Sequence, residues 1–256
     1  MDRSTLSTLF DLSGRVAIVT GGTKGIGRSI AEGFAAAGAA VVVASRKPEA
    51  CRQTEEHLAS MGAKALGVPT HMGELEQIGN LVSQTEQHFG QIDVIVNNAA
   101  NPLAQPVGSF TPEAWQKSLD VNLRGPVFLV QEALPYLEAS GHASVINVIT
   151  AGVFMFSPAQ AIYVAAKSAL MSMTRAMAAA YAPSGIRVNA LAPGTTDTDM
   201  VRNTGPASVA SMTESSRLRR LAHPDEMVGP ALLLASDAGS YVTGQVLLVD
   251  GALAAN

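Results

Sequence analysis

Residues 16–27 read VAIVTGGTKGIG, an apolar run that passes directly into a turn with four glycines. Glycine lets a backbone turn tightly and approach a ligand, and the free N–H groups that open a following helix attract an anion. In doubly wound α/β proteins, the first strand-to-helix turn binds a dinucleotide pyrophosphate. Because the spacing of Gly21, Gly25 and Gly27 differs from G-x-G-x-x-G, an ordinary glycine-rich turn is an alternative for this stretch alone.

Short apolar runs alternate with stretches of helical periodicity along the whole chain. The runs predict strands, several of them apolar at consecutive positions, over 16–20, 40–44, 65–68, 92–96, 144–149, 186–191 and 246–249. Helices are predicted over 25–37, 48–61, 75–89, 112–137, 159–182 and 224–236. This order predicts an α/β fold, a single-domain Rossmann-type doubly wound parallel sheet with helices on both faces.

Domain organisation follows from the lack of any linker-like stretch or internal repeat. We expect one domain over residues 1–256. Residues 195–220 are polar, rich in small residues and weakly periodic, which is typical of a flap over a site. The sequence therefore predicts a substrate flap within this one domain.

The composition excludes several classes of protein. Of the 256 residues 47% are hydrophobic and 15% charged, and the net charge is −4, which excludes a disordered chain and disfavours electrostatic binding of nucleic acid. The lone Cys51 cannot close a bridge within the chain, and no Cys/His cluster has zinc-ligand spacing, so we expect no metal site. No apolar run approaches the roughly 20 residues that span a bilayer, and residues 1–12 do not resemble a signal peptide. We therefore expect a cytoplasmic protein.

Residues 41–47 read VVVASRK, the predicted second strand and its end. An acidic residue here would hydrogen-bond the adenosine ribose and repel a 2′-phosphate, whereas Ser45 and Arg46 offer a hydroxyl and a guanidinium fork. Lys24 in the glycine turn adds a second positive charge. The sequence therefore predicts NADP(H), preferred over NAD(H), with solvated surface charges as the alternative.

Tyr163 and Lys167 stand four residues apart in a predicted helix, so they share one face. A cation beside a phenol lowers a pKa that is otherwise near ~10, which makes the pair a candidate for acid–base catalysis. Thr150 ends the predicted fifth strand, and doubly wound sheets bind ligands at the carboxyl ends of their strands. Taken singly, these residues have ordinary alternatives: a packing tyrosine, a surface lysine and a threonine that suits a strand.

Together these motifs resemble the short-chain dehydrogenase/reductase family in its short, single-domain form, over nearly the whole chain. After the glycine turn the family's order continues with Asn97-Asn98-Ala99-Ala100, Asn122, Thr150, Tyr163 with Lys167, Pro193-Gly194 with Thr198, Thr243-Gly244 and Asp250-Gly251. The resemblance implies an oxidoreductase that acts on a small-molecule carbonyl or alcohol, without nucleic-acid or membrane partners. Members of this form are usually homotetramers.

The resemblance implies a role for each matching residue. Tyr163 would be the general acid in reduction, Lys167 would bind the nicotinamide ribose and lower the pKa of Tyr163, and Asn122 would hold a water in a proton relay. Thr150 would hold the substrate oxygen. The residues expected to contact the cofactor are Gly21, Thr23, Lys24, Gly25, Ile26, Gly27, Ser45, Arg46, His71, Asn98, Ala99, Tyr163, Lys167, Pro193, Gly194 and Thr198.

Three positions depart from the family's pattern. Thr150 replaces the usual serine, and its extra methyl group stiffens χ1 and crowds the substrate oxygen. His71 stands where the third strand usually delivers an aspartate to the adenine amino group, so it is either an adenine neighbour or a loop histidine without a role. The segment Asn97-Asn98-Ala99-Ala100 lacks the usual final glycine. Beside Ser45, Arg46 and Lys47, this variant looks like the NADP-dependent dicarbonyl and retinal reductases.

Large apolar residues follow Thr150 closely and predict a substrate pocket lined by Thr150, Phe154 and Phe156. Such a pocket favours an apolar ketone, aldehyde or diketone over a sugar, although some of these side chains could belong to the core. Arg217, Arg219 and Arg220 could hold the phosphate of an acyl carrier, or form a solvated face.

Three functions are compatible with the sequence. The first is an NADP(H)-dependent carbonyl reductase or alcohol dehydrogenase, and the second is a 3-oxoacyl-thioester reductase. The third is a non-catalytic NADP-binding regulator or scaffold, which only the replacement of serine by Thr150 suggests. The resemblance disfavours an enoyl reductase, whose tyrosine and lysine would be spaced more widely than Tyr163 and Lys167.

Overall fold

The computed structural model describes residues 2–254, apart from the side chains of residues 3, 4 and 7. Its centre is a seven-stranded sheet in the order β3-β2-β1-β4-β5-β6-β7, in which every neighbouring pair is parallel. The strands are β1 (Val16–Thr20), β2 (Ala40–Ser45), β3 (Ala65–Pro69), β4 (Val94–Asn97), β5 (Ser144–Val148), β6 (Arg187–Pro193) and β7 (Val246–Val249). The predicted strands and the parallel doubly wound sheet are confirmed.

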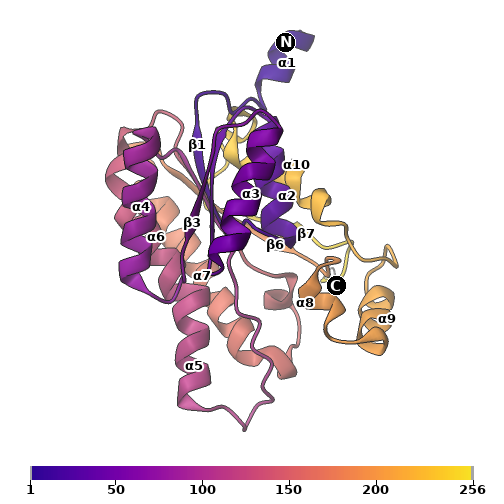
Figure 1. The fold of residues 1–256 in the computed structure, drawn as a ribbon. Coiled ribbons are helices and arrows are strands. Elements are labelled where there is room, and N and C mark those ends of the chain that lie inside the picture. The colour runs from indigo at the N-terminus through magenta and orange to yellow at the C-terminus, as the bar shows by residue number, and fades with distance from the viewer. Residues whose placement is uncertain (1, 255–256) are drawn as a thin grey trace.

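Helices cover both faces of the sheet, as Figure 1 shows. The α-helices of the described residues are α1 (Arg3–Thr8), α2 (Gly25–Ala36), α3 (Pro48–Ser60), α4 (Leu75–Phe89), α5 (Pro112–Leu119), α6 (Gly125–Ala139), α7 (Ala161–Tyr181), α8 (Asp199–Arg202), α9 (Pro206–Ser215) and α10 (Val228–Ala235). None of the helices within residues 2–254 combines the length and the apolarity needed to cross a membrane.

Two hydrophobic cores hold these layers together because alternate strand residues face opposite sides of a sheet. On β1, Ile18 packs into the core that contains residues of α4, α6 and α7. Its neighbours Ala17 and Val19 pack into the other core, with residues of α2, α3 and α10. All five residues of β1 are buried, which explains why its sequence is apolar without alternation.

The order of the strands creates a crevice at the centre of the sheet. The chain first builds β1, β2 and β3 outward and then returns to place β4 on the other side of β1, with Ala17 paired to Val94 and Val19 to Val96. In open α/β sheets, ligands bind outside the carboxyl ends of strands at such a switch point. Here that point lies between Thr20 and Asn97.

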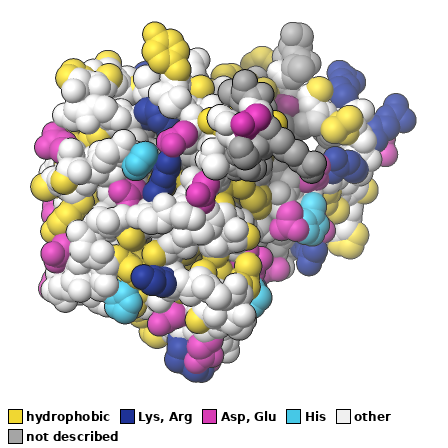
Figure 2. All heavy atoms as spheres, turned by 90° about the horizontal axis from the view of Figure 1, so that it is seen from above, with side chains coloured by type: hydrophobic (Ala, Val, Ile, Leu, Met, Phe, Trp, Pro, Cys, Tyr) yellow, Lys and Arg dark blue, Asp and Glu magenta, His cyan; other side chains and the backbone are white. Residues whose placement is uncertain are grey.

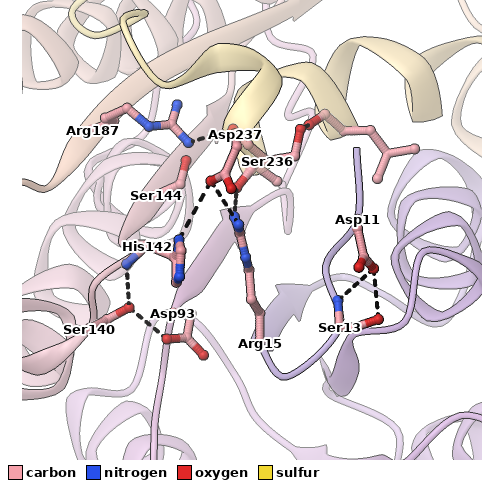
Figure 3. A network of polar contacts seen from close by, with 12 residues as sticks. Asp11, Ser13, Arg15, Asp93, Ser140, His142, Ser144, Arg187, Ser236 and Asp237 are labelled. Atoms are coloured by element: carbon pink, nitrogen blue, oxygen red, sulfur yellow. Dashed lines mark hydrogen bonds and ion pairs between the residues drawn. The ribbon is translucent and has the colours of Figure 1, made fainter. Parts of the chain in front are cut away.

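The opposite end of the sheet is closed by a polar network (Figure 3). Arg15, just before β1, is 6% exposed and donates to the Asp237 carboxylate at 2.7 Å and to the Ala235 carbonyl at 3.1 Å. Asp93, before β4, accepts from the Val16 N–H and from the Ser140 hydroxyl. Viewed from this end, acidic and basic side chains are interspersed over the coloured surface (Figure 2).

One predicted helix is divided in the structure. The stretch 112–137 folds as α5, a π-helical turn over Asp120–Arg124 and α6, rather than as one continuous helix. Pro126 has no N–H to donate to the carbonyl of residue 122, so the α-helical ladder cannot continue there. The Gly125 N–H instead donates to the Asp120 carbonyl five residues back. This wider turn carries Asn122, which is fully buried.

Two further differences concern short helices. The predicted helix over 224–236 consists of a 3-10 turn at Pro224–Met227 followed by α10. The region 195–220, predicted as a flap from its weak periodicity, contains α8 and α9. The domain predicted over 1–256 also includes positions 1, 255 and 256, which lie outside the described residues.

Candidate active site

The glycine turn links β1 to α2 at the switch point of the sheet. Gly21 has φ +65°, in the left-handed region that favours glycine. A Cβ atom at Gly27 would lie 2.3 Å from Asn98 Nδ2 and 2.4 Å from the Gly21 carbonyl oxygen. Asn98 Nδ2 donates to the Thr20 carbonyl at 2.9 Å, which joins the turn to the end of β4. Both glycines are therefore required by close approach of the backbone.

The start of α2 fits the pyrophosphate of a dinucleotide. Its N-cap residue, Lys24, makes no side-chain cap hydrogen bond, so the first-turn N–H groups are left for a ligand. A Cβ atom at Gly25 would lie 3.0 Å from Thr198 Cγ2, so only a small residue leaves room between the turn and Thr198. Thr23 and Ile26, which flank Gly25, are partly exposed at the same turn.

The predicted cofactor cations lie at the neighbouring strand end and in the turn. Arg46 directly follows β2, is exposed, and has no hydrogen bond or ion pair through its side chain within residues 2–254. Ser45, the last residue of β2, accepts the Thr70 N–H through its carbonyl at 2.8 Å. Lys24 lies 3.9 Å from the Asp199 carboxylate at the start of α8. The sequence did not predict this contact, and both side chains are too exposed for it to be strong.

Tyr163 and Lys167 lie on one face of α7, and Lys167 reaches the carboxyl end of β5. The Lys167 Nζ atom donates to the carbonyl of Val148, the last residue of β5, at 2.8 Å and lies 6.0 Å from the centroid of the Tyr163 ring. Tyr163 is 9% exposed and Lys167 is 1% exposed. The structure thus brings the predicted pair together beside the end of β5, where Thr150 follows.

Burial shifts the pKa values of Tyr163 and Lys167. It raises the pKa of Tyr163 from 10.0 to about 12, and it lowers the pKa of Lys167 from 10.5 to about 7. Both shifts disfavour the charged form, as desolvation requires. The lowering of the Tyr163 pKa by Lys167 that the resemblance implies is not seen in this structure, where burial is the cause of the upward shift. At neutral pH the phenol carries its proton.

Asn122 connects the π-helical turn to the segment after β4. Its Nδ2 donates to the carbonyls of Asn101 and Ser118, both at 2.9 Å, and its Oδ1 accepts the Asn101 N–H at 3.0 Å. The sequence did not identify Asn101 and Ser118 as partners. Ser118 lies four residues before Asn122, the spacing of one helical face, whereas the contact with Asn101 depends on tertiary structure.

A buried chain of amides lies under the site. Asn97 Nδ2 donates to Asn147 Oδ1 at 2.9 Å, and Asn147 Nδ2 donates to the Thr174 hydroxyl at 2.9 Å. All three residues are at most 1% exposed. These hydrogen bonds fix β4 and β5 against α7, which positions Tyr163 and Lys167. Sequence reasoning placed Asn97 at this strand end but missed Asn147 and Thr174.

Thr150 and the aromatic residues after it have different exposures. Thr150 is partly buried, and its hydroxyl accepts the Gly152 N–H at 3.1 Å, which caps a 3-10 turn over Ala151–Phe154. Phe154 is 42% exposed and Phe156 is fully exposed. Neither ring is enclosed in a pocket in this structure, so a pocket lined by Thr150, Phe154 and Phe156 stays a prediction.

The end of β6 leads into the predicted flap. A Cβ atom at Gly194 would lie 2.6 Å from the Asp250 Cα atom, so Pro193-Gly194 passes directly against the chain after β7. At the other end of the segment, the Arg217 N–H donates to the Gly251 carbonyl at 3.0 Å. These contacts anchor both ends of residues 195–220 beside β7.

The remaining predicted residues take simpler positions. Arg220 pairs with Glu226 through two bonds of 2.6 and 2.7 Å on the surface, which matches the solvated alternative rather than a phosphate site. Ala99 donates its N–H to the Thr20 hydroxyl beside the glycine turn.

Within residues 2–254, no group of three or more His, Cys, Asp and Glu side chains is arranged to hold a metal ion.

Comparison with known proteins relates this site to a family. Residues 21–253 match a family model described as enoyl-(acyl carrier protein) reductase. The human dehydrogenase/reductase SDR family member 4 is 37% identical over 243 residues, covering 94% of this chain and 87% of that protein. The Arabidopsis thaliana short-chain dehydrogenase/reductase SDRA is 39% identical over 245 residues, covering 94% and 95%.

A solved structure extends the likeness to three dimensions. The gluconate 5-dehydrogenase from Burkholderia cenocepacia J2315, in complex with NADP and tartrate, has a TM-score of 0.93 and 33% identity, covering 98% of this chain and 99% of that one. Sequence and fold thus agree over nearly the whole length. The chain belongs to the short-chain dehydrogenase/reductase family, single-domain oxidoreductases that transfer hydride on alcohol and ketone substrates.

Proposed function

We propose that this protein is an NADP(H)-dependent carbonyl reductase in which Tyr163 is the general acid. The observation that carries this proposal is the buried pair of Tyr163 and Lys167 on one face of α7, next to the carboxyl end of β5. Enzymes of this class work by positioning and proton supply, and a buried phenol beside a buried amine is suited to supply a proton.

Each side chain at the site has a separate role in the proposed proton transfer. Tyr163 holds its proton at neutral pH, since burial raises its pKa to about 12, so it can donate to a carbonyl oxygen as that oxygen gains negative charge. The Thr150 hydroxyl would orient the same oxygen. Lys167, held by the Val148 carbonyl, would stabilise the phenolate left after transfer. Asn122 holds the Asn101 backbone in the segment through which a relay to solvent would pass.

The residues present fit a nicotinamide dinucleotide. The uncapped start of α2, with Gly21 to Gly27, would hold the pyrophosphate, and Gly194 and Thr198 would flank the nicotinamide end. The bound dinucleotide would supply the hydride in reduction. Asn98 shapes the glycine turn through its bond to the Thr20 carbonyl.

Preference for NADP(H) over NAD(H) rests on charge. Ser45 ends β2 and the exposed Arg46 follows it, without a side-chain partner within residues 2–254, where an acidic residue would exclude a 2′-phosphate. Lys24 can leave its weak contact with Asp199, because a doubly charged phosphate attracts it more strongly than one exposed carboxylate. The B. cenocepacia relative is described with NADP, which agrees with this preference.

The substrate we propose is an apolar ketone, aldehyde or diketone. Phe154, Met155 and Phe156 are exposed immediately after the Thr150 turn, and exposed apolar groups beside a site favour apolar ligands. The B. cenocepacia relative is named for gluconate, so a polyhydroxylated substrate is the informative comparison. A 3-oxoacyl thioester is the second candidate, although the pairing of Arg220 with Glu226 removes one cation that could hold an acyl-carrier phosphate. The homotetramer and the cytoplasmic location stay predictions.

A substrate panel tests this function. The wild type is assayed for NADPH and NADH oxidation with diketones, aromatic ketones, aldehydes, 5-ketogluconate and an acetoacetyl thioester. We expect turnover on apolar carbonyls with NADPH, and Arg46→Asp should shift preference toward NADH by about tenfold or more because it replaces attraction of the 2′-phosphate by repulsion. Turnover of 5-ketogluconate alone would overturn the apolar substrate class. NADPH binding without turnover on any carbonyl would favour a regulator or scaffold.

A further inference from the structure

The start of α8 lies against the glycine turn between β1 and α2. A Cβ atom at Gly25 would lie 3.0 Å from Cγ2 of Thr198, the residue before α8. One residue further along, the Asp199 carboxylate lies 3.9 Å from the Nζ atom of Lys24. A close approach and an ion pair thus join the predicted flap, residues 195–220, to the turn proposed to hold the cofactor.

The base of the flap is fixed without this ion pair. The Asp197 N–H donates to the Ala222 carbonyl at 2.8 Å, and the Ala222 N–H donates to the Thr195 carbonyl at 3.0 Å. Beyond these paired residues, α8 and α9 lie to one side of the sheet and contain no buried residue (Figure 1). Because helices without buried side chains are held weakly, one ion pair at the start of α8 affects how firmly they are held.

Lys24 and Asp199 depend on each other as ion-pair partners. Within residues 2–254, Asp199 is the one carboxylate in ion-pair contact with Lys24, and Lys24 is the one cation in such contact with Asp199. The nearby Arg202 is paired with Asp197 through two bonds of 2.7 and 2.8 Å. A phosphate that binds Lys24 therefore competes directly with the Asp199 carboxylate.

We propose that Asp199 is a specificity-determining residue that lowers the affinity for NADP(H) relative to NAD(H), because it competes with the 2′-phosphate of the cofactor for Lys24. This inference rests on the proposed NADP(H) function. By linkage, a phosphate that takes Lys24 also releases the start of α8 from the glycine turn. NAD(H) lacks this phosphate and leaves the ion pair intact.

Calorimetric titration of the cofactor-free protein with NADP⁺ and with NAD⁺, at about 0.15 M salt to screen charges farther apart than ~8 Å, tests the competition. Asp199→Asn keeps the size of the side chain and removes its charge. It should lower the Kd of NADP⁺ about two- to fivefold, the range for an exposed ion pair, and leave the Kd of NAD⁺ unchanged. In a Lys24→Gln background, Asp199→Asn should no longer lower the Kd of NADP⁺, because no lysine is left to compete for.

A matched variant separates the ion pair from the net charge of the flap. Glu214→Gln removes an exposed carboxylate of α9 that has no ion pair within residues 2–254, so it should keep the wild-type ratio of the two Kd values. Hydrogen exchange reports the linked release of α8. In the wild type, residues 199–215 should exchange faster when saturated with NADP⁺ than with NAD⁺, and Asp199→Asn should remove this difference.

Four results would overturn the inference. They are an unchanged Kd ratio in Asp199→Asn, an equal change in Glu214→Gln, the same gain in the Lys24→Gln background, and equal exchange of the wild type with both cofactors. Absence of NADP⁺ binding by the wild type would overturn both this inference and the proposed function. The expected Kd changes without turnover on any carbonyl would support the inference and overturn only the reductase.

Discussion

Replacing Lys167 with methionine tests whether burial sets the protonation of this site. Lys167 is 1% exposed, and burial lowers its pKa from 10.5 to about 7. Methionine keeps a long unbranched side chain without the charge. Because the pKa in the folded chain lies below that in the unfolded chain, the unfolded state holds the additional proton between these values. Stability therefore rises with pH in this window.

The magnitude follows from the two pKa values of Lys167. The free-energy cost of burying the charged form of Lys167 in the folded state is fully present below about pH 7 and has vanished above about pH 10.5. Between pH 7 and pH 9 this group should add about 2 kcal/mol to the free energy of unfolding of the wild type. Lys167→Met lacks this contribution. The free energy of unfolding of the variant minus that of the wild type should therefore fall by that amount between pH 7 and pH 9.

Urea unfolding followed by circular dichroism, at pH 6, 7, 8 and 9 and one protein concentration, measures this difference. The range ends below the pKa of an unfolded tyrosine, so Tyr163 does not contribute. The exposed Lys64 provides a control, because Lys64→Met should follow the wild type at every pH. Parallel pH profiles for the wild type and Lys167→Met would refute the argument that burial neutralises Lys167.

Substitutions at three further residues test the proposed roles of single side chains. Thr150→Ser should keep or raise kcat because the hydroxyl is retained and the crowding methyl is lost, whereas Thr150→Ala should lower kcat roughly 100-fold; equal rates for wild type and alanine variant would remove the hydroxyl from the mechanism. Gly27→Ala should lower the free energy of unfolding by roughly 1–3 kcal/mol in urea titrations, because its Cβ would lie 2.3 Å from Asn98 Nδ2. Gly229→Ala meets nothing within 4 Å and serves as its control, so equal losses would contradict the steric reasoning. Asn122→Ala should destabilise the segment at Asn101 in hydrogen exchange, and unchanged protection there would show that the amide does not hold that segment.

The sequence predicted the architecture because its signals are local. Consecutive apolar residues in β1 reflect burial on both faces. Gly21 has the positive φ of the turn itself, and a Cβ atom at Gly27 would lie 2.4 Å from the Gly21 carbonyl oxygen within that turn. The spacing of Tyr163 and Lys167 likewise predicted that both side chains share one helical face. The structure places Lys167 Nζ against the Val148 carbonyl beside that face.

Other features could not be read from the sequence because they depend on tertiary contacts. The division of the helix over 112–137 involves Asn122, whose amide binds Asn101, 21 residues away. The upward shift of the Tyr163 pKa results from burial by the whole fold, whereas the sequence suggested only the neighbouring cation.

The central claim is that Tyr163 donates the proton in an NADPH-dependent carbonyl reduction. It is tested most directly by measuring NADPH oxidation with the best carbonyl substrate for the wild type and Tyr163→Phe, with NADPH binding measured by fluorescence in both. The account predicts equal NADPH affinity and a loss of turnover of at least about 100-fold in the variant, because phenylalanine keeps the buried ring but has no proton to donate. Turnover by Tyr163→Phe within a few-fold of the wild type would contradict it.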